Sequence, residues 1–321
     1  MNPELFLADL QRKPETLAAL ADTLAAGNPW AALDVRPERV VLLGMGSSAY
    51  AAGMAAARMR ARGLMAVAEL ASSDLLPSWG AGTLVVAISA GGSSIETLDA
   101  LGRLSPEATV VALTNKPESK LAERCGRVVE MGAGPEHGGV ACRTFQHTLA
   151  LLLALEAHLL ESSSDDLVAT MRASVEATSH LLATSETWLP DVTELLDGPA
   201  GVHVAAPARR LSSAQQSALM LREGPRRAAV GCESGDWAHV DVYLTKNTDY
   251  RLLSYAGSRW DAGILEWTLP RSTTVVSVGG EIEGAAFTLR YPGDDQDDVR
   301  LLSEVLVGEL VAARLWLAVA R

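Results

Sequence analysis

One stretch of the chain, Leu84 to Leu98, constrains the fold more than any other. Its first part, Leu84–Ile88, is an unbroken apolar run, which is typical of a parallel strand buried on both faces. The next six residues, Ser89-Ala90-Gly91-Gly92-Ser93-Ser94, combine two glycines with three hydroxyls and open a helix. Glycines let backbone N–H groups turn towards a ligand, and a helix N-terminus attracts anions. The stretch is therefore either a phosphate cradle or an ordinary serine-capped turn.

A second stretch repeats this pattern. The apolar run Val40–Leu43 is followed by Gly44-Met45-Gly46-Ser47-Ser48 and then by an alanine-rich helix through Arg60. One further strand, Met65–Glu69, lies between the two turns. In a doubly wound sheet of order 2-1-3-4-5, the loops after the first and third strands face each other where the strand order reverses. Both polar turns are thus predicted to line one pocket.

The rest of the chain predicts two α/β domains, because strands and helices alternate in each half. In the first half, strands are expected at Val40–Leu43, Met65–Glu69, Leu84–Ile88, Thr109–Leu113 and Arg127–Glu130. In the second half, strands are expected at Gly201–Ala205, Arg251–Ser254, Thr273–Ser277 and Phe287–Arg290, with helices at Ser212–Arg222, Asp261–Thr268 and Asp297–Val319. The turn Ala206–Leu211 lacks glycine and paired hydroxyls. Only the first domain is therefore predicted to hold phosphate.

Helices are expected outside these sheets as well. Pro3–Ala26 has helical spacing, is broken or kinked by Pro14, and is expected to pack outside the first domain. A long apolar helix is predicted at Ala141–Leu160, and a connecting helix at Asp166–Thr187. We therefore predict N-terminal helices at 1–34, a first domain at 35–165, and a linker helix with a second domain at 166–321.

Composition excludes several classes of partner. The formal charge is −12 and no basic stripe is evident, which argues against nucleic acid or an anionic membrane. Three widely spaced cysteines without a CxxC predict neither a disulfide framework nor a metal site. The N-terminus lacks the apolar core of a signal peptide, and no apolar run is long enough to span a bilayer. A cytoplasmic protein is expected.

Taken in order, these motifs resemble the SIS (sugar isomerase) domain family, in the tandem arrangement of the isomerase half of glucosamine-6-phosphate synthase. Ser89–Ser94 is similar to the SxSGxT phosphate motif, and Gly46-Ser47-Ser48 to the GTS turn. Ala141–Phe145 is similar to the STKxF segment that borders the sugar. The resemblance implies two flavodoxin-like three-layer α/β domains, each a parallel sheet flanked by helices.

The resemblance also implies the binding residues. The phosphate-binding set would be Ser47, Ser48, Ser89, Gly91, Ser93 and Ser94. Gly91 stands where the family usually has a serine, so a backbone N–H would replace that hydroxyl. The sugar-lining set would be Val140, Ala141 and Cys142.

Two catalytic residues follow from the same resemblance. Leu219–Glu223 is similar to the LKLKE segment, whose glutamate moves the proton, and His239 stands at the family's spacing for the histidine that helps open the ring. Shifting a carbonyl between two carbons needs a carboxylate base, and ring opening needs a group that exchanges protons near neutrality. In the family this histidine reaches the neighbouring subunit's site, which implies a homodimer with shared sites.

The implied activity is that of a phosphosugar isomerase-type enzyme without a cofactor, acting on a hexose or amino-sugar 6-phosphate. Isomerisation, deamination and deglycation stay open. We expect no glutamine-hydrolysing domain before the pair, and Met220 replaces the first lysine of the LKLKE segment. A full glutamine-dependent aminotransferase is therefore not expected.

Two other readings of the sequence are possible. Gly44–Ala49 also fits GxGxxA after a strand, with Glu69 placed as a ribose-binding acid, which would indicate an NAD-binding enzyme. Alternatively, a SIS protein that has lost catalysis would sense a sugar phosphate and regulate a partner.

Overall fold

The computed structural model describes residues 1–271 and 273–320. Contacts between Cα atoms divide the chain into two compact units. The first-sheet unit comprises Thr16–Pro135 and Arg143–Met171, and the second-sheet unit comprises Met1–Glu15, Glu136–Cys142 and Arg172–Arg321. The short segment Glu136–Cys142 thus belongs to the second-sheet unit although it lies within the sequence of the first. The domain boundaries expected from the sequence stay a prediction.

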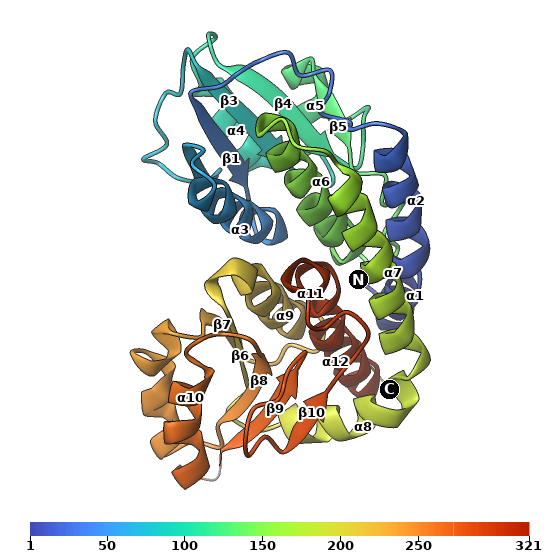
Figure 1. Cartoon of the computed structure of the whole chain (residues 1–321), viewed down its shortest axis with the longest axis vertical. Coiled ribbons are helices and arrows are strands. Elements are labelled where there is room, and N and C mark those ends of the chain that lie inside the picture. The colour runs from blue at the N-terminus through green and yellow to red at the C-terminus, as the bar shows by residue number, and fades with distance from the viewer. Residues whose placement is uncertain (272, 321) are drawn as a thin grey trace. The chain divides into compact units, whose positions relative to one another are not determined.

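The first-sheet unit contains a five-stranded parallel sheet (Figure 1). Its strands are β1 (Arg39–Gly44), β2 (Ala66–Leu70), β3 (Thr83–Ile88), β4 (Thr109–Thr114) and β5 (Val128–Glu130). Their order is β2-β1-β3-β4-β5, and Leu43 on β1 pairs with Ala87 on β3. The expected strands and the expected strand order are confirmed.

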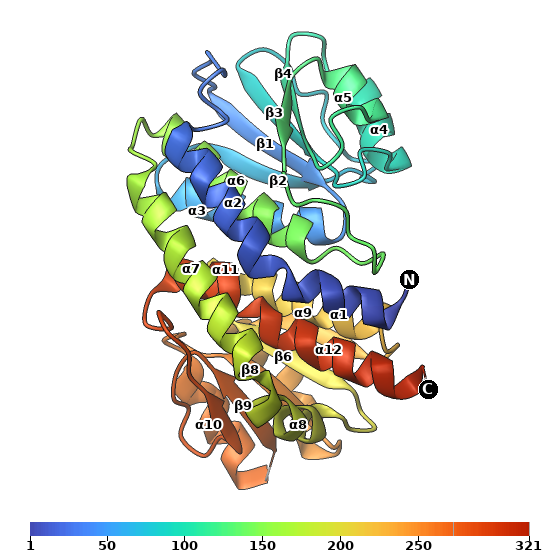
Figure 2. The same cartoon turned by 90° about the vertical axis from the view of Figure 1, so that its right-hand side faces the viewer.

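Helices cover both faces of this sheet. They are α3 (Ser47–Ala61), α4 (Ile95–Gly102), α5 (Lys120–Cys125) and α6 (Arg143–Leu159). In Figure 2, α3 and α6 lie on one face and α4 and α5 on the other. The long helix α6 is buried from Arg143 to Glu156, so its apolar residues serve the core of the chain.

The second-sheet unit repeats the same topology. Its strands are β6 (Val202–Ala206), β7 (Ala229–Glu233), β8 (Arg251–Tyr255), β9 (Thr274–Val278) and β10 (Phe287–Leu289), in the order β10-β9-β8-β6-β7. Renumbered within the unit, this order is again 2-1-3-4-5. The two α/β domains with parallel sheets are confirmed, and β7 is an edge strand that no sequence pattern announced. Gly231 of β7 lets the strand approach α9, since a Cβ there would lie 2.7 Å from the backbone of Ala214.

The helices of this unit are α1 (Pro3–Gln11), most of α7 (Asp165–Ala183), α8 (Ser185–Leu196), α9 (Leu211–Glu223), α10 (Asp261–Thr268), α11 (Asp297–Ser303) and α12 (Val305–Val319). The expected connecting helix Asp166–Thr187 ends earlier, at Ala183, and the expected helix Asp297–Val319 is divided at Glu304. Within the described residues, no helix is both long and apolar enough to cross a membrane.

The placement of the first helix corrects an expectation. The N-terminal segment breaks at Arg12, just before Pro14, into α1 and α2 (Lys13–Ala26). However, α1 packs on α12 in the second-sheet unit, not outside the first domain. Phe6 and Leu10 join the hydrophobic core that contains Leu310, and a fully buried ion pair joins Lys13 to Glu309. The free energy gained by burying these side chains against α12 determines where α1 packs, although the first sheet follows it more closely in sequence.

Candidate functional site

The turn after β1 is shaped by two glycines. A Cβ on Gly44 would lie 2.8 Å from the Cβ of Ser48, so only glycine lets the first turn of α3 approach the strand this closely. Gly46 precedes α3 with φ +52°, a region that favours glycine. Ser47 and Ser48 are the first two residues of the helix and are half-buried. The first turn of α3 thus presents two hydroxyls at the carboxyl end of β1.

The turn after β3 is held by its own backbone. The Ser89 N–H donates to the Leu113 carbonyl at 3.1 Å, and the Gly92 N–H donates to the Ser89 carbonyl at 3.0 Å. Gly92 has φ +60°, and a Cβ there would lie 2.0 Å from the Ser119 hydroxyl oxygen. This turn can therefore form only with glycine at position 92.

Two backbone donors of the β3 turn are available to a ligand. Among the described residues, no protein acceptor pairs with the backbone N–H of Gly91 or of Ser93, and both residues are exposed. Ser94 caps α4 by accepting from the Thr97 N–H at 3.2 Å, and its hydroxyl donates to the exposed Glu96 carboxylate at 2.8 Å. Because β1 and β3 are adjacent, the structure brings the six predicted phosphate-binding residues to one edge of one sheet.

The three predicted sugar-lining residues lie in the second-sheet unit, in the segment Glu136–Cys142. Hydrogen bonds to side chains fix the backbone of this segment. The Gly138 N–H donates to the Asp9 carboxylate and the Cys142 N–H to the Glu136 carboxylate, each at 2.7 Å. The Ala141 carbonyl accepts from the Gln216 side-chain amide at 2.9 Å. Gln216 belongs to α9, so the backbone of this segment is bonded to the helix that carries Glu223.

Glu223 is the last residue of α9. The helix stops there because Gly224 and Pro225 follow, and a Cβ on Gly224 would lie 2.9 Å from the Trp316 ring. Burial raises the pKa of Glu223, and the neighbouring Arg222 and Arg226 lower it in part. A half-buried carboxylate with a raised pKa is the usual form of a general base.

Sequence reasoning missed Gln216. It is fully buried and stands two helical turns before Glu223, on the same face of α9. The sequence does show a glutamine seven residues before the candidate base, a spacing that places both side chains on one face of a helix. Its partner, the Ala141 carbonyl, could not be inferred from the residue type.

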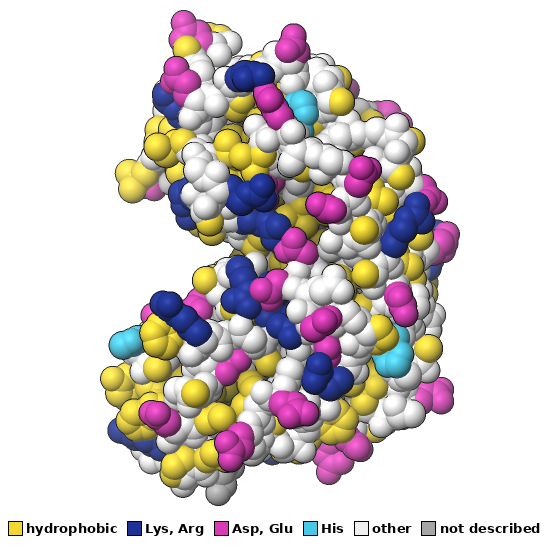
Figure 3. All heavy atoms as spheres, in the orientation of Figure 1, with side chains coloured by type: hydrophobic (Ala, Val, Ile, Leu, Met, Phe, Trp, Pro, Cys, Tyr) yellow, Lys and Arg dark blue, Asp and Glu magenta, His cyan; other side chains and the backbone are white. Residues whose placement is uncertain are grey.

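Among the described residues, His239 makes no hydrogen bond with these groups, and its surroundings differ from theirs. It follows the short helix η2 (Asp236–Ala238), and its side chain is exposed. The backbone N–H of His239 donates to the Asp236 carbonyl at 2.8 Å. Within the part of the chain that is described, no hydrogen bond joins His239 to Glu223. Exposed hydrophobic residues surround this region in sequence, and Figure 3 shows hydrophobic side chains on the surface over α10.

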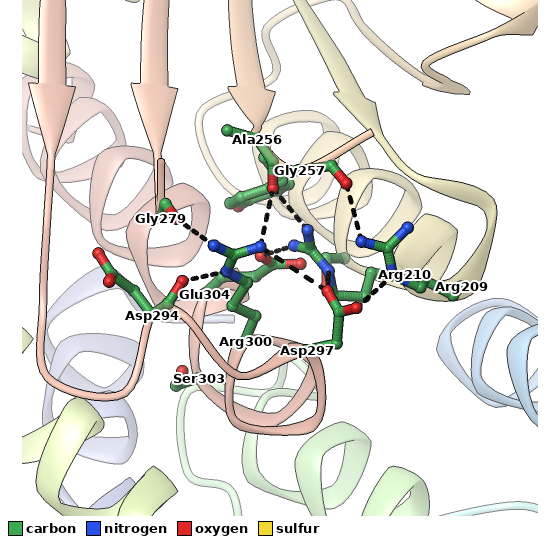
Figure 4. A network of polar contacts seen from close by, with 12 residues as sticks. Arg209, Arg210, Ala256, Gly257, Gly279, Asp294, Asp297, Arg300, Ser303 and Glu304 are labelled. Carbon is green, nitrogen blue, oxygen red and sulfur yellow. Dashed lines mark hydrogen bonds and ion pairs between the residues drawn. The ribbon is translucent and has the colours of Figure 1, made fainter. Parts of the chain in front are cut away.

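The corresponding crevice of the second sheet has different chemistry (Figure 4). Arg209 donates to Asp297 at 2.5 Å and to the Gly257 carbonyl at 2.8 Å, while Arg210 forms a buried ion pair with Glu304. The Arg300 side chain donates to the Gly279 carbonyl at 2.6 Å.

The loop after β8 is filled by a carboxylate of the chain itself. Asp261 accepts from the Gly257 N–H at 2.7 Å and from the Ser258 N–H at 3.0 Å. These two backbone N–H groups are thus paired within the chain, in contrast to those of Gly91 and Ser93 after β3. Among residues 1–271 and 273–320, no group of three or more His, Cys, Asp or Glu side chains is arranged to hold a metal ion.

The comparisons with known proteins identify the first α/β domain. Residues 35–157, which include both hydroxyl-bearing turns, match the SIS domain model. This part of the chain is a SIS domain, and the dinucleotide reading of Gly44–Ala49 loses its support.

Over most of its length the chain is similar to one half of a larger enzyme. It is 24% identical over 323 residues to the isomerizing glutamine–fructose-6-phosphate aminotransferase of Aeropyrum pernix, covering 95% of this chain and 50% of that protein. The chain spans half or less of the length of the curated relatives it matches.

Two solved structures show the same fold. The C-terminal domain of glucosamine-fructose-6-phosphate aminotransferase from Francisella tularensis aligns with a TM-score of 0.82 at 17% identity, covering 98% of this chain and 95% of that chain. Tagatose-6-phosphate ketose/aldose isomerase from Escherichia coli aligns with a TM-score of 0.81 at 15% identity, covering 99% and 93%. The chain therefore contains a SIS domain at residues 35–157 and is related to the isomerase half of that aminotransferase.

Proposed function

We propose that the protein is a phosphosugar isomerase-type enzyme that acts on a hexose or amino-sugar 6-phosphate by glutamate-mediated proton transfer. The observation that carries this proposal is the pair of hydroxyl-bearing turns at the carboxyl ends of the adjacent strands β1 and β3. The three reactions left open, which are isomerisation, deamination and deglycation, all need proton transfer through an enediol-like state. The related structures named above are those of a glucosamine-fructose-6-phosphate aminotransferase domain and a tagatose-6-phosphate isomerase, and these names support the substrate class.

In this proposal the phosphate is held by hydroxyls and backbone N–H groups alone. Ser47, Ser48, Ser89 and Ser93 donate their hydroxyls, and Ser94 does so once its hydroxyl leaves the Glu96 carboxylate. The free N–H of Gly91 takes the place of a further hydroxyl. The positive ends of α3 and α4 add to the attraction, since phosphate is favoured at helix N-termini.

The sugar is placed by the segment Val140–Cys142, and Glu223 moves the proton. Glu223 takes a proton from one carbon and returns it to the next, and its raised pKa makes it a stronger base than an exposed glutamate. Burial raises the pKa of the Cys142 thiol well above its usual value, so this side chain stays protonated and does not act as a nucleophile. Val140 and Cys142 lie in the hydrophobic core with Phe6 and Leu10, which corrects the expectation that their side chains line the sugar. Of the three, only the half-buried Ala141 is open to a ligand.

His239 would serve ring opening in the site of a second copy, which makes the enzyme a homodimer. The exposure of His239 supports this, as do its exposed neighbours Val240, Tyr243 and Leu244. The apolar face that such an interface needs comes from this region, because α6 and most of α12 are already buried within the chain. The three free thiols are consistent with a cytoplasmic enzyme.

A protein that senses sugar phosphate without turnover is the second candidate. Met220 favours it, since this buried side chain replaces a lysine of the family pattern. Purified protein incubated with a panel of hexose and amino-sugar 6-phosphates, followed by proton NMR, separates the two. Turnover of one member supports the enzyme. Binding without turnover supports the sensor, and equal affinity for phosphorylated and unphosphorylated sugars contradicts both.

A further inference from the structure

The segment that carries His239 is fastened at two buried points. Trp237 is fully buried and Asp241 nearly so, while His239 between them is exposed. The backbone of His239 is therefore held from both sides, and its imidazole is left outside the core.

Both anchors meet at one atom, the hydroxyl oxygen of Tyr250. The Trp237 indole N–H donates to this oxygen at 2.8 Å, and the hydroxyl donates to the Asp241 carboxylate at 3.3 Å. A phenol has one donor and accepts readily, so this arrangement uses both capacities. Tyr250 is itself buried, just before β8.

The ring of Tyr250 is fixed by the sheet. The His203 imidazole of β6 stacks on it with 4.0 Å between ring centroids. Burial raises the pKa of Tyr250 far above its usual value, so the hydroxyl remains a donor throughout the accessible pH range. On β7, the Cys232 thiol lies 3.6 Å from the same Asp241 carboxylate oxygen. Side chains from β6, from β7 and from the residue before β8 thus contact one another or the 237–241 segment itself.

We propose that Tyr250 is a positioning residue for His239. Its hydroxyl holds Trp237 and Asp241 together, and so fixes the 237–241 segment in the conformation from which His239 exchanges the proton of ring opening. This inference rests on the proposed function. It adds a residue that touches no substrate and acts only through the histidine.

The test compares two substrates of one enzyme. The Tyr250→Phe variant keeps the stacked ring and removes both hydrogen bonds. With a ketose 6-phosphate that closes to a ring, its kcat should fall about tenfold, because small displacements of a catalytic group cost this much or more. With the 5-deoxy analogue, which lacks the hydroxyl that closes the ring, kcat should match that of the wild type. His239→Asn should show the same selectivity, and the double variant should lose nothing further.

Tyr291→Phe is the matched control, since Tyr291 is a buried tyrosine that follows β10, the edge strand farthest from β7 in the same sheet. It should show no preference between the two substrates. Equal losses on both substrates in Tyr250→Phe, or full additivity with His239→Asn, would overturn the positioning role and leave the isomerase proposal standing. Absence of turnover by the wild-type protein would instead remove the proposed function.

A second readout needs no turnover. The imidazole proton signal of His239, assigned by its loss in His239→Asn, should shift or broaden in Tyr250→Phe and stay unchanged in Tyr291→Phe. An unchanged His239 signal in Tyr250→Phe would contradict the proposal whatever the activity.

Discussion

The crevice after β1 and β3 and the crevice after β6 and β8 occupy the same position in two sheets of the same strand order, and they are built from opposite chemistry. The first presents serine hydroxyls and free N–H groups. The second is filled by arginines and carboxylates that pair with one another (Figure 4). Topology thus supplies a crevice twice, and the loop residues decide whether it stays open for an anion or is closed by the chain's own charges.

The largest expected effect comes from breaking the closed crevice. In Arg210→Met, the buried Glu304 loses its partner, which should lower the free energy of unfolding by about 3–5 kcal/mol. Sugar-phosphate affinity of the folded fraction should not change. Urea unfolding measures the first effect and calorimetric titration the second.

A double variant, Arg210→Met with Glu304→Met, is the control, because replacing both partners leaves no buried unpaired charge. It should recover most of the lost stability. A loss of sugar-phosphate affinity in either variant would show that the second crevice also binds the ligand.

The open crevice should respond in the reverse manner. Ser89→Ala should weaken sugar-phosphate binding by about 1–3 kcal/mol, because it removes a donor to a desolvated anion. Ser94→Ala should do the same and also lower stability by about 1 kcal/mol through loss of the α4 cap. Ser258→Ala, in the loop after β8, is the matched control and should leave affinity unchanged. Titration with a hexose 6-phosphate decides between these outcomes.

The smallest effect concerns a competitor within the open crevice. The Glu96 carboxylate accepts a hydrogen bond from the Ser94 hydroxyl and places a negative charge beside the predicted anion site. Glu96→Gln should tighten sugar-phosphate binding by about twofold to fivefold at low salt, with the gain falling as salt screens the charge. Weaker binding would mean that Glu96 helps to form the cradle.

Sequence periodicity was enough to predict most of this fold. Parallel strands buried on both faces give apolar runs, so β1, β3 and β8 were evident, and the glycine and serine turns after β1 and β3 marked the open crevice. The edge strand β7 was missed because Ala229–Glu233 is only partly buried and shows no such run.

The closed crevice lay beyond sequence reasoning for a different reason. Arg210 pairs with Glu304, 94 residues away, and the Gln216 amide pairs with a backbone carbonyl 75 residues away. An arginine or glutamine has many possible partners at such distances, and only the folded chain selects one. The place of the N-terminal helix α1 could not be predicted either, because it depends on packing against α12, a helix at the far end of the sequence.

The pH dependence of turnover locates the base. Burial raises the pKa of Glu223, and the base must be ionised to accept a proton. The rate should therefore rise with pH until it passes through that raised pKa, above the ordinary value of 4.5. The folded state holds this proton more tightly than the unfolded chain, so ionisation of Glu223 lowers stability as the pH rises. Glu223→Gln should thus leave stability at neutral pH unchanged or slightly higher.

The most direct test of a phosphate-binding first sheet and a proton-transferring second is to measure kcat and sugar-phosphate affinity together in Glu223→Gln. The amide keeps the shape of the side chain and cannot accept a proton from carbon. We predict that kcat falls by about 10²–10⁴-fold while affinity stays near that of the wild type. Retention of more than about a tenth of wild-type kcat would place the base elsewhere.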